Sequence, residues 1–330
     1  MTASPEPGPD HAGMGSAGMD ADELELFATA LGGVTANRTG EALDAALDEL
    51  GWRDALELDR RAAISTLFDL QGQAGATSSA LDHVLVAAVG LETSPSTAVV
   101  LPWPGSTAAG SAGVDGLAVR GLGTAALGRS ETAVVAVDPD EIALVATKDL
   151  TLRPIAGIDE AFGLVEVHGA GVAADRQPGA WRDATDAGRV ALAHQLVGTS
   201  RTMLALAREH AIERIQFDRP IAEFQAVRHR LAEAYVAVEG ADSAAGGAWE
   251  DGSSLAAAAA KAMAGRSARI VSRHSQQVLA GIGFTVEHPL HEFVRRALVL
   301  DRLLGDTRSL TREIGADIIR SRHVPALLPL

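Results

Sequence analysis

The sequence contains no cysteine among its 330 residues. A disulfide framework, a thiolate metal site and a cysteine nucleophile are therefore excluded, and the absence favours a cytoplasmic protein. No apolar run approaches the roughly 18 uncharged residues that a membrane-spanning helix needs. Residues 1–19 have neither the basic nor the apolar region of a secretory signal and are rich in Gly, Pro, Ala and Ser. We expect a flexible tail there, and no association with membranes.

Basic residues are scarce: 28 Lys and Arg stand against 43 Asp and Glu, which gives a net charge of -15. Such a charge disfavours binding to phosphate backbones, so we expect no nucleic-acid partner. Hydrophobic residues make up 47% of the chain. This content is enough to bury a real core in two or three packed units.

The spacing of apolar residues divides the chain into three segments. In residues 20–95 they recur with the helical period, for example at Leu24, Phe27 and Leu31, which predicts a reduced N-terminal domain of three or four short helices. Residues 96–180 are predicted to form a β-rich middle domain, and residues 181–330 a C-terminal four-helix bundle. The helices of the bundle are expected at about 186–214, 221–248, 254–279 and 289–319.

Short β-branched runs between Gly, Pro and Asp characterise the middle segment. The predicted strands are Ala98–Leu101, Ala133–Val137, Ile142–Val145 and Leu164–Val167. Helical patterns do not alternate with these strands, so a doubly wound nucleotide-binding fold is not supported. Gly121, Gly123 and Gly128 faintly suggest a dinucleotide loop, but no helix pattern follows, and we predict a turn between strands.

Two long patterns lie at predicted helix ends of the C-terminal segment. Residues 214–225 read RIQFDRPIAEFQ, followed by a Leu-Ala pair, and residues 277–289 read QVLAGIGFTVEHP. In composition, order and separation they resemble the two patterns of the C-terminal domain of acyl-CoA dehydrogenases. The resemblance covers about Asp186 to Ile319 and implies that family's fold, with its helical, β-rich and helical order.

The resemblance also implies a cofactor role for the matching residues. In the family they bind the ADP part of an FAD whose flavin ring lies in the neighbouring subunit. Arginine offers a fork of donors to a pyrophosphate, amides offer neutral contacts, and glycine lets backbone N–H groups approach closely. The alternative interpretation is structural: a helix-end cation, surface amides, and a helix cap with a turn. The predicted FAD-binding residues are Arg214, Phe224, Gln225, Gln277, Ala280 and Gly281.

The family's catalytic glutamate has no counterpart. The matching position holds Leu304 or, with a one-residue shift, Gly305, and the alternative position before an arginine on the first bundle helix holds Gly188. None of these residues can take a proton. A shift of two residues would reach Asp306, a weak candidate for an atypical base. The motifs that contact the flavin ring are degenerate too, since residues 101–107 and 122–127 match them poorly.

A chain that keeps the half-site serving a neighbour's FAD and lacks its own resembles the smaller, non-catalytic subunit of α2β2 acyl-CoA dehydrogenases of bacterial steroid breakdown. The resemblance implies a catalytic partner subunit, an acyl-CoA substrate and an electron-transfer flavoprotein or similar acceptor. Two alternatives stay open: a self-sufficient dehydrogenase that uses Asp306, and a structural homologue without flavin. We predict no metal site, because Pro289 breaks the only close histidine pair, His288 and His291.

Overall fold

The computed structural model describes residues 18–113 and 115–322, so the predicted tail at 1–19 lies almost wholly outside the described residues. Five helices precede the sheet, where three or four were expected. The first has a capping box in which Asp20 and Glu23 bind each other's backbone N–H groups. Gly75 ends the fourth in the left-handed conformation. The helices are α1 (Ala21–Thr35), α2 (Glu41–Glu49), α3 (Trp52–Leu58), α4 (Arg60–Ala74) and α5 (Ala80–Ala88).

The middle segment forms one mixed sheet with the order β6-β7-β3-β1-β4-β5-β8, in which β2 also pairs with β3. Only β1 and β4 pair in parallel. The strands are β1 (Thr97–Pro102), β2 (Gly110–Ala112), β3 (Leu117–Gly123), β4 (Thr132–Asp138), β5 (Glu141–Ala146), β6 (Thr151–Pro154), β7 (Val165–Val172) and β8 (Ala174–Pro178). The predicted turn at Gly121 and Gly123 was wrong, because both glycines lie within β3. A Cβ on Gly121 would lie closer than van der Waals contact to a backbone oxygen of β1.

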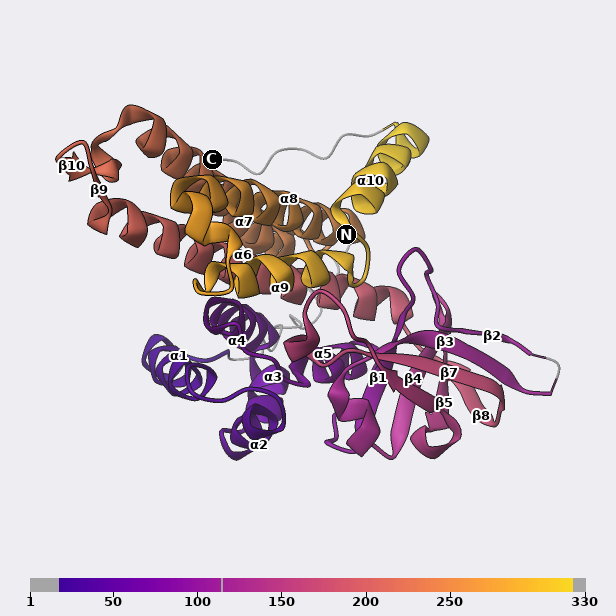
Figure 1. The fold of residues 1–330 in the computed structure, drawn as a ribbon. Helices are drawn as coiled ribbons and strands as arrows, with labels where there is room; N and C mark the ends of the chain where they lie inside the picture. Colours follow the sequence, from indigo (N-terminus) through magenta and orange to yellow (C-terminus); the bar gives the residue numbers. More distant parts are fainter. Residues whose placement is uncertain (1–17, 114, 323–330) are drawn as a thin grey trace, which may run out of the picture.

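Alternation along the strands divides the sheet between two cores. Val99 and Leu101 of β1 join the large core shared with the helices. Ala98 and Val100 point the other way into a separate apolar cluster on the opposite face. The sheet is therefore anchored to the helical part of the molecule through one face (Figure 1).

Long helices build the C-terminal segment: α6 (Trp181–Glu213), α7 (Gln225–Asp251), α8 (Ser254–Leu279), α9 (Leu290–Arg302) and α10 (Thr307–Ser321). Helices α6 to α9 form the bundle above the N-terminal helices and the sheet, and α10 projects away from it (Figure 1). The single helix expected over 289–319 was wrong. Leu304 and Gly305 adopt positive φ values of 54° and 107°, which stop α9, and the Asp306 side chain caps the start of α10.

The second bundle helix also starts later than expected. Residues 215–220 form the hairpin β9 (Ile215–Gln216) and β10 (Arg219–Pro220), and Ile221–Glu223 form a 3₁₀ turn. Pro220 therefore belongs to the hairpin and not to the first turn of α7. The extended backbone of Phe224, with ψ 130°, delays the helix until Gln225.

Candidate functional site

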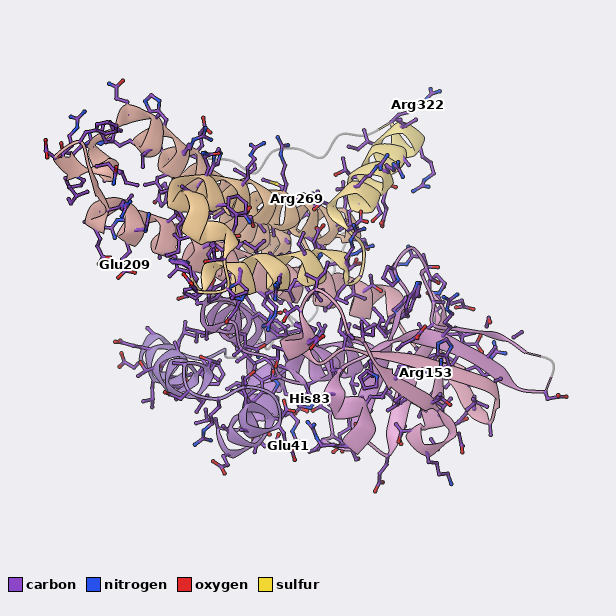
Figure 2. All side chains as sticks on the ribbon, viewed as in Figure 1. Glu41, His83, Arg153, Glu209, Arg269 and Arg322 are labelled. Atoms are coloured by element: carbon purple, nitrogen blue, oxygen red, sulfur yellow. The ribbon has the colours of Figure 1, made fainter. Side chains whose placement is uncertain are left out.

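The predicted FAD-binding residues lie at or next to the end of α6, the start of α7 and the end of α8, on the side of the bundle where Figure 1 shows β9 and β10. Because α6, α7 and α8 run antiparallel in turn, the end of α6, the start of α7 and the end of α8 meet there. A hydrogen bond of 3.0 Å from Ser275 Oγ to the Met203 carbonyl joins α8 to α6. Figure 2 shows Glu209, from the last turns of α6, near the same end.

Arg214 is the C-terminal cap of α6, and its side chain is exposed. Its carbonyl accepts the Ile221 N–H at 2.9 Å, which ties the base of the hairpin to the helix. Gln225 opens α7 and is exposed, and no side chain caps this helix at Phe224. The first N–H groups of α7 and the Arg214 guanidinium together favour an anion at this end.

The hairpin turn holds an aromatic side chain in solvent. Phe217 and Asp218 have φ values of 53° and 61°, as the two central residues of a type I′ turn require. Left-handed backbone costs a non-glycine residue about 1–2 kcal/mol. Phe217 is 86% exposed, and its ring meets Phe224 edge-on with centroids 6.0 Å apart. Arg219 Cζ lies 4.3 Å from the centroid of the Phe224 ring, so two contacts with that ring support the turn.

The end of α8 also combines a strained backbone with exposed side chains. Ala280 has φ 53° and ψ -131°, a region that favours glycine, and the following residues form a 3₁₀ turn, η5 (Ala280–Phe284). Gln277, Ala280 and Gly281 are exposed. A Cβ on Gly281 would meet nothing within 4 Å, which leaves open space beside its backbone.

Large apolar side chains are uncovered around these polar positions. They come from the end of α6, the hairpin and the segment after α8. The exposed residues are Ile212, Ile215, Phe217, Ile282, Phe284 and Val286. Such a concentration of uncovered apolar side chains is typical of an interaction surface. We call this part of the molecule the bundle end.

The two positions that match the family's alternative bases are in contact with each other. The Leu304 side chain lies against Gly188 so closely that a Cβ at residue 188 would overlap Leu304 Cδ1, and Leu85 would be only 2.9 Å away. Arg189 Nε donates to the Leu304 carbonyl at 3.1 Å and fixes the turn. The apolar side chain of Leu304 therefore occupies the space where residues 188 and 304 meet.

Asp306, the weak candidate for a base, caps a helix instead. It accepts the Ser309 N–H at 2.8 Å and pairs with Arg302 at 2.8 Å. The Ser309 N–H holds the pKa of Asp306 below its ordinary value, with further lowering by Arg302. A general base for an α-proton needs the opposite shift.

A buried lysine on α8 binds the turn between α9 and α10. Lys261 on α8 is fully buried, and its Nζ donates to the carbonyls of Asp301 at 3.2 Å and Gly305 at 3.4 Å. Burial lowers its pKa to about 8. Gly265, one turn further on, has no room for a Cβ beside Asp301, and Arg269 pairs with that carboxylate at 3.2 Å. One face of α8 thus holds the α9–α10 turn.

The space between the two degenerate flavin motifs is nearly closed. A cavity of about 20 Å³ remains between Leu101, Thr124, Phe162 and Leu303. A single water needs roughly 10–15 Å³, whereas cofactor pockets span about 300–1,000 Å³. A larger cavity of about 310 Å³ lies outside it, between the loop after β1, the start of α6 and the α9–α10 turn, and Leu304 forms part of its wall.

A buried carboxyl group lies beside this closed space. Asp82, in the first turn of α5, accepts the Thr124 hydroxyl at 2.9 Å, while its second oxygen, Oδ1, has no hydrogen-bond partner. Complete burial raises the pKa of Asp82 to about 7. Nothing in the sequence pattern indicated this group, since Asp82 was one acidic residue among 43.

The histidines near the start of α9 have a structural role. His288 Nδ1 accepts the Leu290 N–H at 3.1 Å, at the first residue of the helix. Within residues 18–113 and 115–322, no group of three His, Asp or Glu side chains is placed to hold a metal ion. Over the same ranges, no helix is both long and apolar enough to cross a bilayer.

Comparison with known proteins identifies the family. The family model for the C-terminal domain of acyl-CoA dehydrogenases matches residues 180–319. Acyl-CoA dehydrogenase IpdE2 of Mycobacterium tuberculosis is 28% identical over 88% of this chain and 93% of that protein. IpdE2 of Mycolicibacterium smegmatis is 32% identical over 40% of this chain and 43% of that protein. Residues 180–319 therefore belong to the family of acyl-CoA dehydrogenase C-terminal domains, and the chain as a whole is similar to acyl-CoA dehydrogenases.

Solved structures share the fold along nearly the whole chain. A steroid ACAD, Tcur3481-Tcur3483, superposes with a TM-score of 0.77 at 20% identity and covers 91% of this chain and 99% of that one. The ChsE4-ChsE5 complex from Mycobacterium tuberculosis gives a TM-score of 0.74 at 20% identity, over 95% and 100%. The predicted acyl-CoA dehydrogenase fold, with its helical, β-rich and helical order, is confirmed.

Proposed function

We propose that this acyl-CoA dehydrogenase chain is the accessory subunit of an FAD-dependent enzyme that dehydrogenates a bulky acyl-CoA at its α,β-bond. The contact between Leu304 and Gly188 carries the proposal, because it fills both places for the family's glutamate with hydrocarbon. The catalytic base must then come from a partner subunit. This chain then contributes residues that bind the cofactor and shape the site.

The bundle end suits the ADP half of an FAD whose ring lies in the partner. Arg214 and the uncapped start of α7 would meet the pyrophosphate, and Gln225 and Gln277 would offer amide contacts. The open space beside Gly281 leaves room for close backbone approach. When bound, FAD supplies the acceptor for the hydride that leaves the β-carbon of the acyl-CoA. The uncovered apolar side chains around these groups would exclude water against the partner.

The proposed substrate is a steroid-derived acyl-CoA, and the proposed assembly is α2β2 in the cytoplasm. Support comes from the likeness to a steroid ACAD and to a complex of two named chains, ChsE4 and ChsE5. We propose an electron-transfer flavoprotein or a similar protein as the electron acceptor. The acidic surface, with a net charge of -15, is unsuited to a nucleic-acid partner.

Co-expression with a catalytic acyl-CoA dehydrogenase partner tests the proposal through native mass and flavin absorbance. We expect a colourless protein from this chain alone and a yellow heterotetramer from the pair. In the pair, Arg214→Ala should lower the flavin content at least several-fold, because one buried charge-assisted pair is worth about 1.5–3 kcal/mol. Arg153→Ala is the matched control, since Arg153 is an exposed arginine on β6, away from the bundle end (Figure 2).

Three results would contradict the assignment in different ways. Stoichiometric FAD and acyl-CoA oxidation in this chain alone would favour a self-sufficient enzyme, and Asp306→Asn should then abolish turnover. Full flavin content in the Arg214→Ala complex would favour a purely structural homologue. A colourless complex would remove the shared cofactor altogether.

A further inference from the structure

The connection between β6 and β7 separates two hollows. On its inner side, Phe162 lines the cavity of about 20 Å³ together with Leu101 and Thr124. On its outer side, residues 157–161 line a hollow of about 500 Å³, whose other wall is formed by Ala74, Gly75 and the first turns of α9. The β6–β7 connection therefore separates the nearly filled inner cavity from the open outer hollow.

A buried ion pair holds this partition in place. Arg296 of α9 pairs through Nε with Asp159 at 2.5 Å, and the two side chains are only 6% and 8% exposed. Arg296 Nη1 also donates to the carbonyls of Gly75 at 2.8 Å and Ala76 at 3.2 Å, at the end of α4. Three separate parts of the chain thus meet at one guanidinium group.

The same guanidinium group lies beside the aromatic ring of the loop. Arg296 Cζ is 5.1 Å from the Phe162 ring centroid. On its other side, the Phe162 ring borders the cavity that Leu101 and Thr124 also line, and these two residues belong to the two degenerate flavin motifs.

We propose that residues 157–163 are an internal plug, in which Phe162, held by the Asp159–Arg296 pair, takes the place of a planar aromatic cofactor ring. The plug rests on the proposed function and explains how an acyl-CoA dehydrogenase chain stays closed to a flavin of its own. Opening the plug creates a site for a flat aromatic molecule. Small aromatic molecules bind apolar cavities of roughly 150 Å³ made by removing one side chain.

Phe162→Ala in the full chain tests the cavity directly. The variant should lose thermal stability, and saturating indole should restore part of the loss, whereas the wild type should show no shift. Phe293→Ala is the matched control: it removes a phenyl ring from the outer hollow, leaves the inner space closed, and should gain nothing from indole. A folded Phe162→Ala variant that ignores indole would overturn the plug.

A variant that also breaks the Asp159–Arg296 pair tests whether a ligand larger than indole, riboflavin, can bind. The double variant Asp159→Asn with Phe162→Ala should quench riboflavin fluorescence with at least a tenfold gain in affinity over the wild type. Equal riboflavin binding by the wild type would refute the plug. If neither variant folds, hydrogen exchange on the wild type decides: the amides of Phe162 and Gly163, which donate to the carbonyls of Asp159 and Glu160, should be protected, and rapid exchange at both would refute the plug.

These tests are independent of the bundle end. Loss of flavin from the complex with Arg214→Ala would leave the proposed function standing even if Phe162→Ala bound nothing. A colourless complex would remove the proposed function, while indole rescue would still show that Phe162 fills a ring-sized space.

Discussion

Under the proposed function, the bundle end and the interior between sheet and bundle correspond to the two halves of one kind of site, and the two regions differ in structure. At the bundle end, Arg214, Gln225 and Gln277 are exposed among uncovered apolar side chains. In the interior, the Leu304 side chain packs against Gly188, and Phe162 lines a cavity of only about 20 Å³. Under the proposed function, the difference teaches that one half-site can be lost by filling while the other stays open.

Both regions use strained backbone, but they hold it differently. Phe217 and Ala280 adopt positive φ in exposed segments that only ring contacts and the end of a helix support. Leu304 adopts it over a fully buried lysine that donates to two carbonyls of the same turn. A partner that binds the bundle end can therefore change its strained backbone, whereas the strained backbone of the interior is held in place by the surrounding fold.

The largest expected effect comes from the ion pair that closes the interior. Arg296→Met should lower the free energy of unfolding by about 3–5 kcal/mol, because it leaves Asp159 buried without a partner. Arg295→Met is the control: its side chain is exposed, and its cost should stay within about 0.5 kcal/mol. Urea unfolding measures both variants. Equal, small losses would mean that the interior is not held closed by this pair.

The buried carboxyl beside the closed space should make stability depend on pH. Burial raises the pKa of Asp82 from 3.8 to about 7, so its contribution is fully present below pH 3.8 and is lost as pH rises through about 7. Asp82→Asn keeps an oxygen for the Thr124 hydroxyl and cannot ionise. Relative to the wild type, we expect this variant to gain a few kcal/mol as the pH rises from about 3.8 to about 7, and to keep that gain at higher pH.

Unfolding free energies of Asp82→Asn across this range, with exposed Asp149→Asn as the charge-matched control, measure the effect. A difference between Asp82→Asn and wild type that stays constant with pH would show that the carboxyl titrates as in the unfolded chain. The closed interior would then be wetter than its burial indicates.

The contact between the two base positions predicts coupled substitutions. Gly188→Ala should cost about 1–3 kcal/mol, because the new methyl group overlaps Leu304. In the Leu304→Ala background the same change should cost at least about 0.5–1 kcal/mol less. Gly281→Ala, whose methyl group would meet nothing within 4 Å, controls for glycine replacement at the open end. Additive costs would show that the two positions do not share one volume.

Sequence patterns predicted the order of the segments and the strands β1, β4, β5 and β7 because these depend on local periodicity, whereas β2, β3, β6 and β8 were missed. They failed where a single backbone conformation decides. Leu304 at positive φ divides one expected helix into α9 and α10, and a helical apolar pattern continues through the break. A helix was expected from about residue 221, but the turn at Phe217 and Asp218 forms a hairpin that includes Pro220 and delays the helix.

The candidate site shows the same division. Motifs at helix ends gave the residues of the bundle end, since each motif is one continuous stretch of sequence at the end of a helix. The closure of the interior depends on Arg296 and Asp159, which lie 137 positions apart, and no motif joins them.

The smallest expected effect concerns the strained residue at the open end. Ala280 has a φ of 53°, where a Cβ costs about 1–2 kcal/mol. Glycine would remove this strain, but its greater freedom in the unfolded chain offsets part of the gain in stability. Ala280→Gly should therefore raise the free energy of unfolding by about 0.5–1 kcal/mol. The flavin content of the complex should not fall, because the backbone conformation is kept. A loss of stability would mean that the Ala280 methyl group makes a contact at the bundle end that outweighs its strain, and the open end would then be less open than its exposure indicates.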